Sequence, residues 1–346
     1  MDSRDTVALL VKFAGRKHRA EKASLPSLRD CGSAPVSPSW PAMHTKIPQI
    51  LLTLLTFTAL SLEAKPLIGG PKTIQVADDG TVPGSVASPM MGQGSYIKGA
   101  TKVAVPLIAV AFETSAMARV SHGSRDKITT KSLELKLRVD DAVLQGITAE
   151  LEEMVEKDLT DQGFEILPAN SIDQEPRWLG ITKDGVPGQE IKDNFMSGFM
   201  GNGNFSRWFA AGGRPLFGTG ATGALSETSA LIRTARERKI SLLFYRFKVQ
   251  FTELEGRNNL VFNYLKGQNS LHIVSADVAV FTPEHTQGSM IKLNANLAAG
   301  TDFIQELQGV KGNYTVVVNP EQYKADSLLL IHAVSRQLAQ ALRKGQ

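Results

Sequence analysis

The chain has 346 residues, of which 42% are hydrophobic and 21% charged, a composition typical of globular proteins with one large or two modest domains. Its formal net charge of +4 comes from residues 1–46, which carry eight Lys or Arg and four Asp or Glu; the other 30 bases and 30 acids balance. Because residues 47–346 are formally neutral, charge gives no support for nucleic-acid binding, and we expect no nucleic-acid partner.

Residues 43–64 have the three parts of a secretory signal peptide. A short basic stretch, Met43–Lys46, precedes the apolar run Ile47–Leu60, and small residues such as Ala59 and Ala64 lie near a cleavage position. We therefore predict export, with a mature protein in the periplasm or associated with the outer membrane.

Residues 1–42 show scattered Pro and Ser without a period, so we interpret them as a non-native extension upstream of a true start at Met43, or as a disordered segment. The alternative is that Ile47–Leu60 remains uncleaved as an anchor in the inner membrane, since this run is only slightly short of a membrane span. The single cysteine, Cys31, lies in the extension. The mature chain is therefore expected to have no disulfide and no cysteine-based metal site.

Residues 65–100 are rich in Gly, Pro, Ser and Met, which predicts a flexible arm, extended or disordered. Residues 101–346 are predicted to form one α/β (or α+β) domain, which begins with the nearly continuous apolar segment Val103–Phe112. Such a segment is typical of a strand covered on both faces. Pro106 within it removes a ladder donor and indicates an edge position, a bulge or the start of the strand.

A half-buried strand and an amphipathic helix follow. Residues 131–139 alternate apolar and polar side chains, as a strand with one buried face does. Asp140 or Asp141 can cap a helix over about residues 141–162, and Gly163 ends it in the left-handed conformation. We expect a short strand directly after this helix, at Phe164–Leu167.

The remaining elements complete the predicted sheet. Residues 168–187 are expected to form a loop, residues 225–238 a helix, and residues 255–259 a turn. The expected later strands span residues 240–251, 260–265, 271–281, 290–297 and 314–318. Apolar residues then step by three and four over about 325–344, predicting a C-terminal helix. The fold class is therefore a single mixed sheet covered by this helix and by the helix at about 141–162.

An insertion at residues 195–226 interleaves large apolar side chains with glycines. It is either a mobile amphipathic segment that touches a membrane or a partner subunit, or a long loop whose aromatic side chains pack against the sheet. The candidate contact residues are Phe195, Phe199, Phe205, Trp208, Phe209 and Phe217.

The sequence Gly218-Thr-Gly-Ala-Thr-Gly223 matches the fingerprint of a dinucleotide-binding loop. Glycines at Gly218, Gly220 and Gly223 would let backbone donors and a helix N-terminus approach a pyrophosphate. However, no clear strand precedes the loop, and the next acid after a strand, Glu253, lies beyond the usual spacing of about 20 residues. We prefer a flexible Gly/Thr loop and predict no cofactor.

No active site is assembled in the sequence. The six histidines form no pair with each other or with cysteine at metal-ligand spacing, which predicts no metal site. Ser121 and His122 are adjacent, but a nucleophile needs a base that faces it in space. His272 and His332 are expected to be packed or surface side chains. We therefore predict a protein that is not an enzyme.

The order of elements resembles that of bacterial envelope α/β domains, namely the curli-secretion channel lipoprotein and related penicillin-binding-protein activators. The resemblance rests on Val103-Ala-Val-Pro-Leu107, on the helix end Leu159–Leu167, on the hairpin Val274–Gly288 and on the closing helix from Leu328. It implies a non-enzymatic assembly role at the envelope. In the channel family membrane hairpins interrupt such a domain, and residues 195–223 are compared with one.

The sequence thus predicts a non-enzymatic, exported bacterial envelope protein that acts in binding or assembly. Its partner would be another protein or a second copy of itself, with a membrane surface as a further contact. The alternative is a small-molecule or nucleotide-binding module that uses the loop from Gly218 to Gly223.

Overall fold

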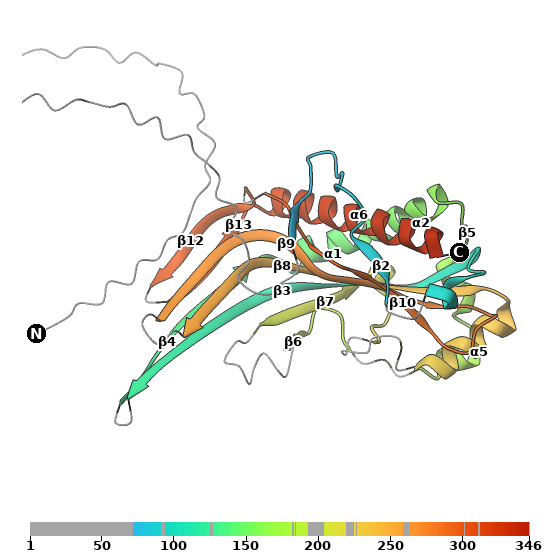
Figure 1. Cartoon of the computed structure of the whole chain (residues 1–346), viewed down its shortest axis with the longest axis horizontal. Coiled ribbons are helices and arrows are strands. Elements are labelled where there is room, and N and C mark those ends of the chain that lie inside the picture. Colours follow the sequence, from blue (N-terminus) through green and yellow to red (C-terminus); the bar gives the residue numbers. More distant parts are fainter. Residues whose placement is uncertain are drawn as a thin grey trace, which may run out of the picture. The chain divides into compact units, whose positions relative to one another are not determined.

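The computed structural model describes most of the chain after residue 71. The described residues are 72–90, 94–124, 127–181, 183, 185–192, 204–218, 225, 227–258, 263–300, 302–310 and 312–345. They form a mixed α/β fold in which one large curled sheet of 13 strands is combined with a few helices, the last at the C-terminus (Figure 1). The predicted fold class is confirmed.

The sheet is built around β3 (Lys102–Ser124), which pairs with four other strands. It is parallel to β8 (Ser241–Asn258) and, over its first residues, to β5 (Glu165–Leu167); it is antiparallel to β7 (Phe205–Ala210) and β4 (Lys127–Arg138). The main strand order is β1-β11-β9-β8-β3-β4-β13-β12. The strands in it not yet given are β1 (Thr73–Gln75), β11 (Asn296–Ala298), β9 (Asn263–Phe281), β13 (Asn313–Val318) and β12 (Ile304–Val310).

Pro106 lies at an irregularity of the sheet, which confirms one of the three positions that the sequence allowed. The register between β3 and β8 shifts between Ala104 and Leu107. Before the shift, Val103 and Val105 face the larger apolar core; after it, Ile108 and the alternate residues that follow do so. A bulge adds one residue on one strand, so it changes which side chains face each side of the sheet.

Two long antiparallel pairs extend from the sheet, β3 with β4 and β8 with β9 (Asn263–Phe281). The predicted turn at residues 255–259 is wrong, because β8 continues to Asn258, which pairs with Asn263. Residues 263–265 of the strand expected at 260–265 and the whole strand expected at 271–281 are therefore parts of one strand, β9, while residues 260–262 lie outside the described residues. Polar residues and Gly267 interrupt its apolar pattern, but cross-strand hydrogen bonds do not depend on side-chain polarity.

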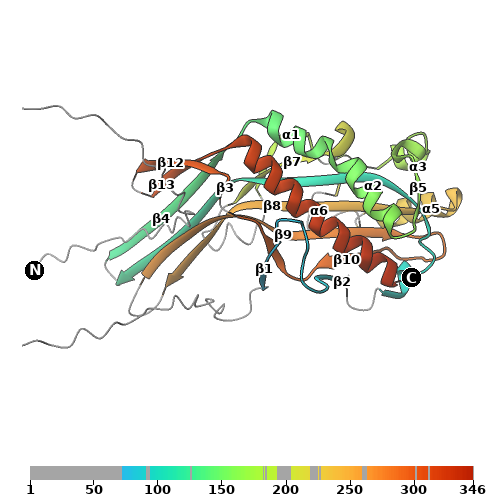
Figure 2. The ribbon, with the colours of Figure 1, turned by 90° about the horizontal axis from the view of Figure 1, so that it is seen from above.

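Helices α1 (Asp141–Ala149), α2 (Leu151–Asp161) and α6 (Pro320–Gly345) cover one face of the sheet, with α6 crossing the strands obliquely (Figure 2). The predicted single helix over 141–162 is divided in two at Glu150. Gly163 has a φ of 83°, the left-handed conformation expected after a helix.

The C-terminal helix begins earlier than predicted because of a cap. The side-chain Oδ1 of Asn319 accepts hydrogen bonds from the backbone N–H groups of Glu321 and Gln322, at 3.1 and 3.3 Å. Pro320 occupies the first helical position, where its missing N–H is not needed.

The opposite face is covered by α5 (Thr228–Arg238), with short helices at η2 (Ala169–Ile172) and α3 (Pro176–Leu179) in the segment that was expected to be a loop. An apolar cluster there includes Trp178, Phe217, Phe244 and Phe281. The sheet thus has an apolar core on each side.

Within the segment expected to be a flexible arm, two short stretches pair with the sheet. β1 (Thr73–Gln75) is parallel to β11 (Asn296–Ala298), and β2 (Ala87–Pro89) is antiparallel to β10 (Ser289–Leu293). A short helix, η1 (Gly94–Ile97), follows. The backbone pairing does not require an apolar period, so the sequence pattern gave no sign of it.

The sheet ends with a hairpin of β12 (Ile304–Val310) and β13 (Asn313–Val318), of which the sequence predicted only the second strand. Gln305, Glu306 and Gln308 are exposed, so β12 lacks the alternation of a half-buried strand. The remaining short elements are β6 (Glu190–Lys192), paired with β7, and η3 (Ala211–Gly213).

Candidate functional site

The described part of the aromatic insertion, residues 204–218, contributes side chains to the core. Residues 205–210 form β7, which lies against β3, and Phe209 and Phe217 are buried, at 3% and 1% exposure. These two side chains are therefore not available to a partner, which corrects the sequence-based interpretation. Phe205 and Trp208 are partly exposed, whereas Phe195 and Phe199 lie outside the described residues.

Phe217 is held by edge-to-face contacts with Trp178 and Phe244, with ring centroids 5.1 and 5.2 Å apart. The Lys183 ammonium lies 4.1 Å from the centroid of the Trp178 ring, a cation–π distance. Burial lowers the pKa of Lys183. These contacts hold Phe217 of the insertion in the apolar core, so this residue has a structural role.

The glycine loop has little of the context that a dinucleotide site requires. Only Gly218 of the three candidate glycines is described; Gly220 and Gly223 are not. Gly218 has a φ of 65°, and its carbonyl accepts a hydrogen bond of 2.8 Å from Nη1 of Arg246. Before it, Leu216 forms an isolated bridge with Gly185 rather than a strand. The strand that should lead into such a loop is therefore not formed by the described residues before Gly218.

Arg246 of β8 also forms a largely buried ion pair within the sheet. Its Nε and Nη2 donate to Oδ1 and Oδ2 of Asp277, at 3.1 and 2.9 Å, across the β8–β9 pair. The two side chains are only 14% and 9% exposed. Burial raises the pKa of Asp277, and the adjacent guanidinium opposes that shift. Arg246 therefore links the backbone of Gly218 to Asp277 in the sheet.

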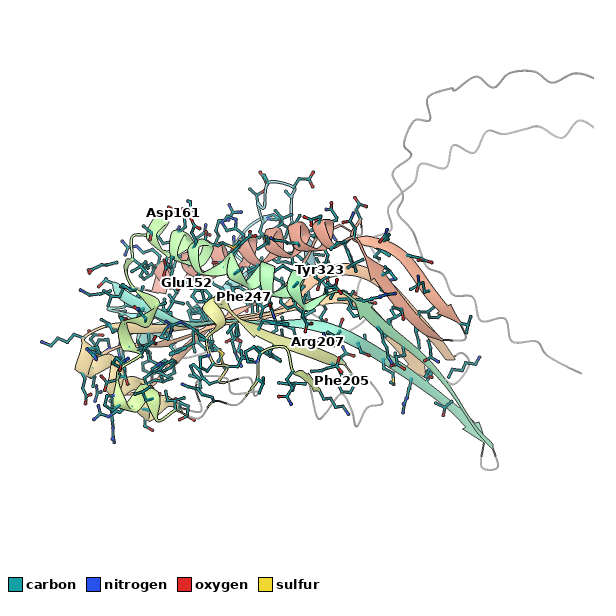
Figure 3. All side chains as sticks on the ribbon, turned by 180° about the vertical axis from the view of Figure 1, so that it is seen from behind. Glu152, Asp161, Phe205, Arg207, Phe247 and Tyr323 are labelled. Carbon is teal, nitrogen blue, oxygen red and sulfur yellow. The ribbon has the colours of Figure 1, made fainter. Side chains whose placement is uncertain are left out.

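A polar cleft of about 330 Å³ lies near Ser115, where the edge of β3 passes from pairing with β7 to pairing with β4. Phe205 and Arg207, labelled on β7 in Figure 3, form one wall. Arg207 donates to Oδ1 of Asp141, and the Thr114 hydroxyl donates to Oε1 of Glu190 at 2.5 Å. Among the charged side chains that line the cleft, Lys136 and Glu134 pair with each other at 3.2 Å. Each charged side chain of the lining thus has a polar partner.

A second, more open cleft of about 580 Å³ lies beside α2. Glu152, labelled in Figure 3, and Glu156 lie on its α2 side, and Arg214 lies across from them. Burial and the charge of Glu152 raise the pKa of Glu156. Arg214 is fixed by Asp173 and by the carbonyl of Pro106, each at 3.2 Å. The position of α2 therefore determines the shape of this cleft.

A serine, a histidine and an aspartate meet between α2 and α6, but their arrangement does not suit catalysis. Nε2 of His332 lies 3.1 Å from Oδ1 of Asp158, and Ser335 is one turn further along α6. Ser335 is fully buried, so its hydroxyl cannot reach a substrate. His272 is also buried, and burial lowers its pKa. Within the described residues no three His, Cys, Asp or Glu side chains gather as metal ligands would.

The long strands also leave backbone edges at both ends of the sheet. Among the described strands, β12 pairs only with β13 on one side, and residues 263–269 of β9 pair only with β8. The C-terminal ends of β3, β8 and β12 and the N-terminal ends of β4, β9 and β13 lie on the same side of the molecule. They extend beyond helices α1, α2 and α6 (Figures 1 and 2). The hairpins β3–β4 and β8–β9 thus extend beyond the helix-covered region.

The outer strand β12 has few of the features that protect such an edge. It contains no Lys, Arg or Pro, and Val310 at its end is 71% exposed. Its one irregularity lies between Ile304 and Glu306, so the stretch from Leu307 to Val310 keeps a regular register with β13. Sequence reasoning missed this strand and therefore this surface.

Comparisons with known proteins found no match to a family model, a curated protein or a solved structure. None of the helices in the described part of the chain combines the length and apolar content needed to cross a membrane.

Proposed function

We propose that this protein is an exported bacterial envelope protein that acts by assembly, without catalysis, and that it associates with copies of itself or with a protein partner. The observation that carries the proposal is the extension of the sheet beyond its helical cover, with backbone edges at β12 and β9. Unpaired strand edges bind other strands through their N–H and C=O groups. A membrane surface is a further contact that this role would allow.

The directions of the two edges support association between copies. β12 is antiparallel to β13, which is parallel to β4; β9 is antiparallel to β8, which is parallel to β3. Because β3 and β4 are themselves antiparallel, β12 and β9 run in opposite directions. A β12 edge placed beside the β9 edge of another copy would form an antiparallel pair, the more common arrangement of neighbouring strands.

We predict that Val310→Lys weakens this association by about tenfold or more in Kd, since the new charge would be brought into a strand interface. The side chain is exposed, so the fold should be retained. Native mass spectrometry of the mature chain over a concentration series measures the effect. Val186→Lys is the matched control, because Val186 is 66% exposed and lies outside the strands. A mature chain that stays monomeric at every concentration and captures no partner would contradict the assembly proposal.

Export is tested separately, by mass spectrometry of the N-terminal peptide of the protein recovered from its native cells. The proposal expects a chain that begins near Leu62 or Lys65, after removal of the signal sequence. A chain that begins at Met1 in a cytoplasmic fraction would rule out the envelope location while leaving the assembly measurement intact.

A further inference from the structure

The end of the molecule at which β3 begins carries many basic side chains. Helices α2, α5 and α6 end there, opposite the tip of the β3–β4 hairpin (Figures 1 and 2). Its bases, all exposed or half-buried, are Lys98, Lys102, Arg177, Arg233, Arg236, Arg238, Lys239, Arg343 and Lys344. Its acids are Glu165, Glu175, Glu237 and Glu284. Bases thus clearly outnumber acids on this surface, which we call the basic end.

The basic end is one continuous surface, because contacts join the elements that form it. Arg236 of α5 donates to two backbone carbonyls of the turn at residues 282–288, at 3.1 and 3.3 Å. In that turn the His285 ring lies 5.6 Å from the Tyr96 ring of η1, measured between centroids. The backbone of Gly345, at the end of α6, adjoins Ile97 of η1. The ends of α5 and α6 are therefore connected through η1.

The acids of the basic end neutralise only part of its charge. Three of them pair with Lys102, Arg177 and Arg238. Four exposed bases form no ion pair with any of the described residues: Lys98, Arg233, Lys239 and Lys344. Because residues 47–346 are formally neutral as a whole, the rest of that chain carries the balancing negative charge. Such a distribution orients the molecule with its basic end toward an anionic surface.

Lys239 has a backbone conformation that favours glycine. Its φ is 53°, and no other non-glycine residue in the described part of the chain has a positive φ. It follows α5 directly, and its N–H donates to the carbonyls of Ala235 and Arg236, as at the end of many helices. Glycine is usual at this position because it has no Cβ to cause a steric cost. A strained backbone of this kind suggests a role for the side chain beyond stability.

Leu179 adds an apolar group to the basic end. Its side chain is 65% exposed on α3, two residues after Arg177, and two ion pairs join α3 and the residue before it to α5. Exposed leucine beside basic residues is typical of proteins that lie at a membrane interface. There the apolar side chain enters the boundary between headgroups and acyl chains, while the bases contact anionic headgroups.

The distribution of the bases also fits a broad surface better than a small ligand. They come from α3, α5, α6, the start of β3 and the residue after η1. None of them lines either of the two clefts described above. Helix dipoles do not account for all of them, because Lys98 and Lys102 do not lie at the end of an α-helix.

We propose that the basic end binds the surface of a bilayer that contains anionic phospholipids, with Lys98, Lys239 and Leu179 among its contact residues. This inference rests on the proposed envelope location and specifies the membrane contact that the assembly role allows. The edges of β12 and β9 extend toward the opposite end of the sheet (Figures 1 and 2). Copies bound to a membrane in this way keep those edges accessible to one another.

Co-sedimentation of the mature chain with vesicles tests the proposal, since that chain lacks the basic residues 1–46. We expect binding to vesicles of equal parts phosphatidylglycerol and phosphatidylethanolamine at low salt. Binding should be lost in about 0.5 M sodium chloride and with phosphatidylcholine vesicles. Lys239→Gly should weaken binding about fivefold, as expected for one base near an anionic surface. The same variant should unfold at an equal or higher temperature, because glycine removes the strain.

Lys131→Gln is the matched control, because it removes an exposed base at the other end of β3, where Lys131 pairs with Val120. It should leave vesicle binding unchanged within error. Leu179→Ser should weaken binding to vesicles. A wild type that does not bind the anionic vesicles, or an equal loss in Lys131→Gln, overturns the proposal. If soluble polyglutamate bound as tightly as the vesicles and Leu179→Ser changed neither affinity, the partner would be an acidic protein and the proposal would be wrong.

Native mass spectrometry of the same samples reports self-association separately. An assembled protein that does not bind anionic vesicles would overturn this inference and leave the assembly proposal intact. A protein that binds the vesicles but stays monomeric and captures no partner would contradict the assembly proposal alone.

Discussion

Replacing Asp277 with Ala should lower the free energy of unfolding by about 3–5 kcal/mol, because it disrupts a buried ion pair. The substitution removes the carboxylate that accepts two hydrogen bonds from the Arg246 guanidinium, a side chain that is only 14% exposed. It also loosens the arginine that bonds the carbonyl of Gly218. Urea unfolding followed by circular dichroism measures the effect.

Two controls separate the cost of disrupting the buried Arg246–Asp277 pair from the loss of an aspartate as such. Asp161→Ala breaks the exposed pair with Lys157 and should leave the midpoint of unfolding unchanged within error. The double change Arg246→Met and Asp277→Leu removes both charges and should recover most of the loss, because well-packed apolar pairs often replace buried ion pairs without cost. A double variant no more stable than Asp277→Ala would show that the charge argument is wrong.

Phe217→Ala should lower the free energy of unfolding by about 3–5 kcal/mol, as large-to-small changes of core aromatic residues do. Phe217 is 1% exposed and packs against Trp178 and Phe244, which in turn contacts Phe281. The substitution would open a cavity at the centre of this cluster. Thermal unfolding by calorimetry measures the loss.

The matched control for Phe217→Ala is Leu179→Ala, in the same region, because Leu179 is 65% exposed. It should change the free energy of unfolding by no more than about 0.5 kcal/mol. If Phe217→Ala were equally mild and instead weakened association, the original interpretation of this residue as a contact surface would be restored.

The sequence could predict those elements whose side chains follow a clear period or have a specific backbone role. Leu243, Tyr245, Phe247, Val249 and Phe251 recur at every second position, with polar residues between the last four, and all five side chains are buried in the same core, as expected. Gly163 marked a helix end, and Pro106 limited its own site to an edge position, a bulge or a strand start, because their backbone restrictions are local. The mixed α/β class followed from such patterns.

The candidate site was predicted less well, because it depends on pairings between distant segments. The exposed polar side chains of β12 give no period, and the long strands β8 and β9 continue through polar residues since cross-strand hydrogen bonds are made by the backbone. Asp158 and His332 are 174 positions apart and look like ordinary helix residues in the sequence.

What the sequence determined by itself was therefore the set of apolar faces, the breaks between elements and the near absence of net charge after residue 46, all of which are local or additive properties. Only the tertiary structure decided which aromatic side chains are buried, which strand edges lack a partner and which acids lie under a helix. Those outcomes depend on neighbours that the chain brings together on folding, such as β3 beside β7 at Phe209. Burial is a property of that assembled environment, and the residue type alone does not set it.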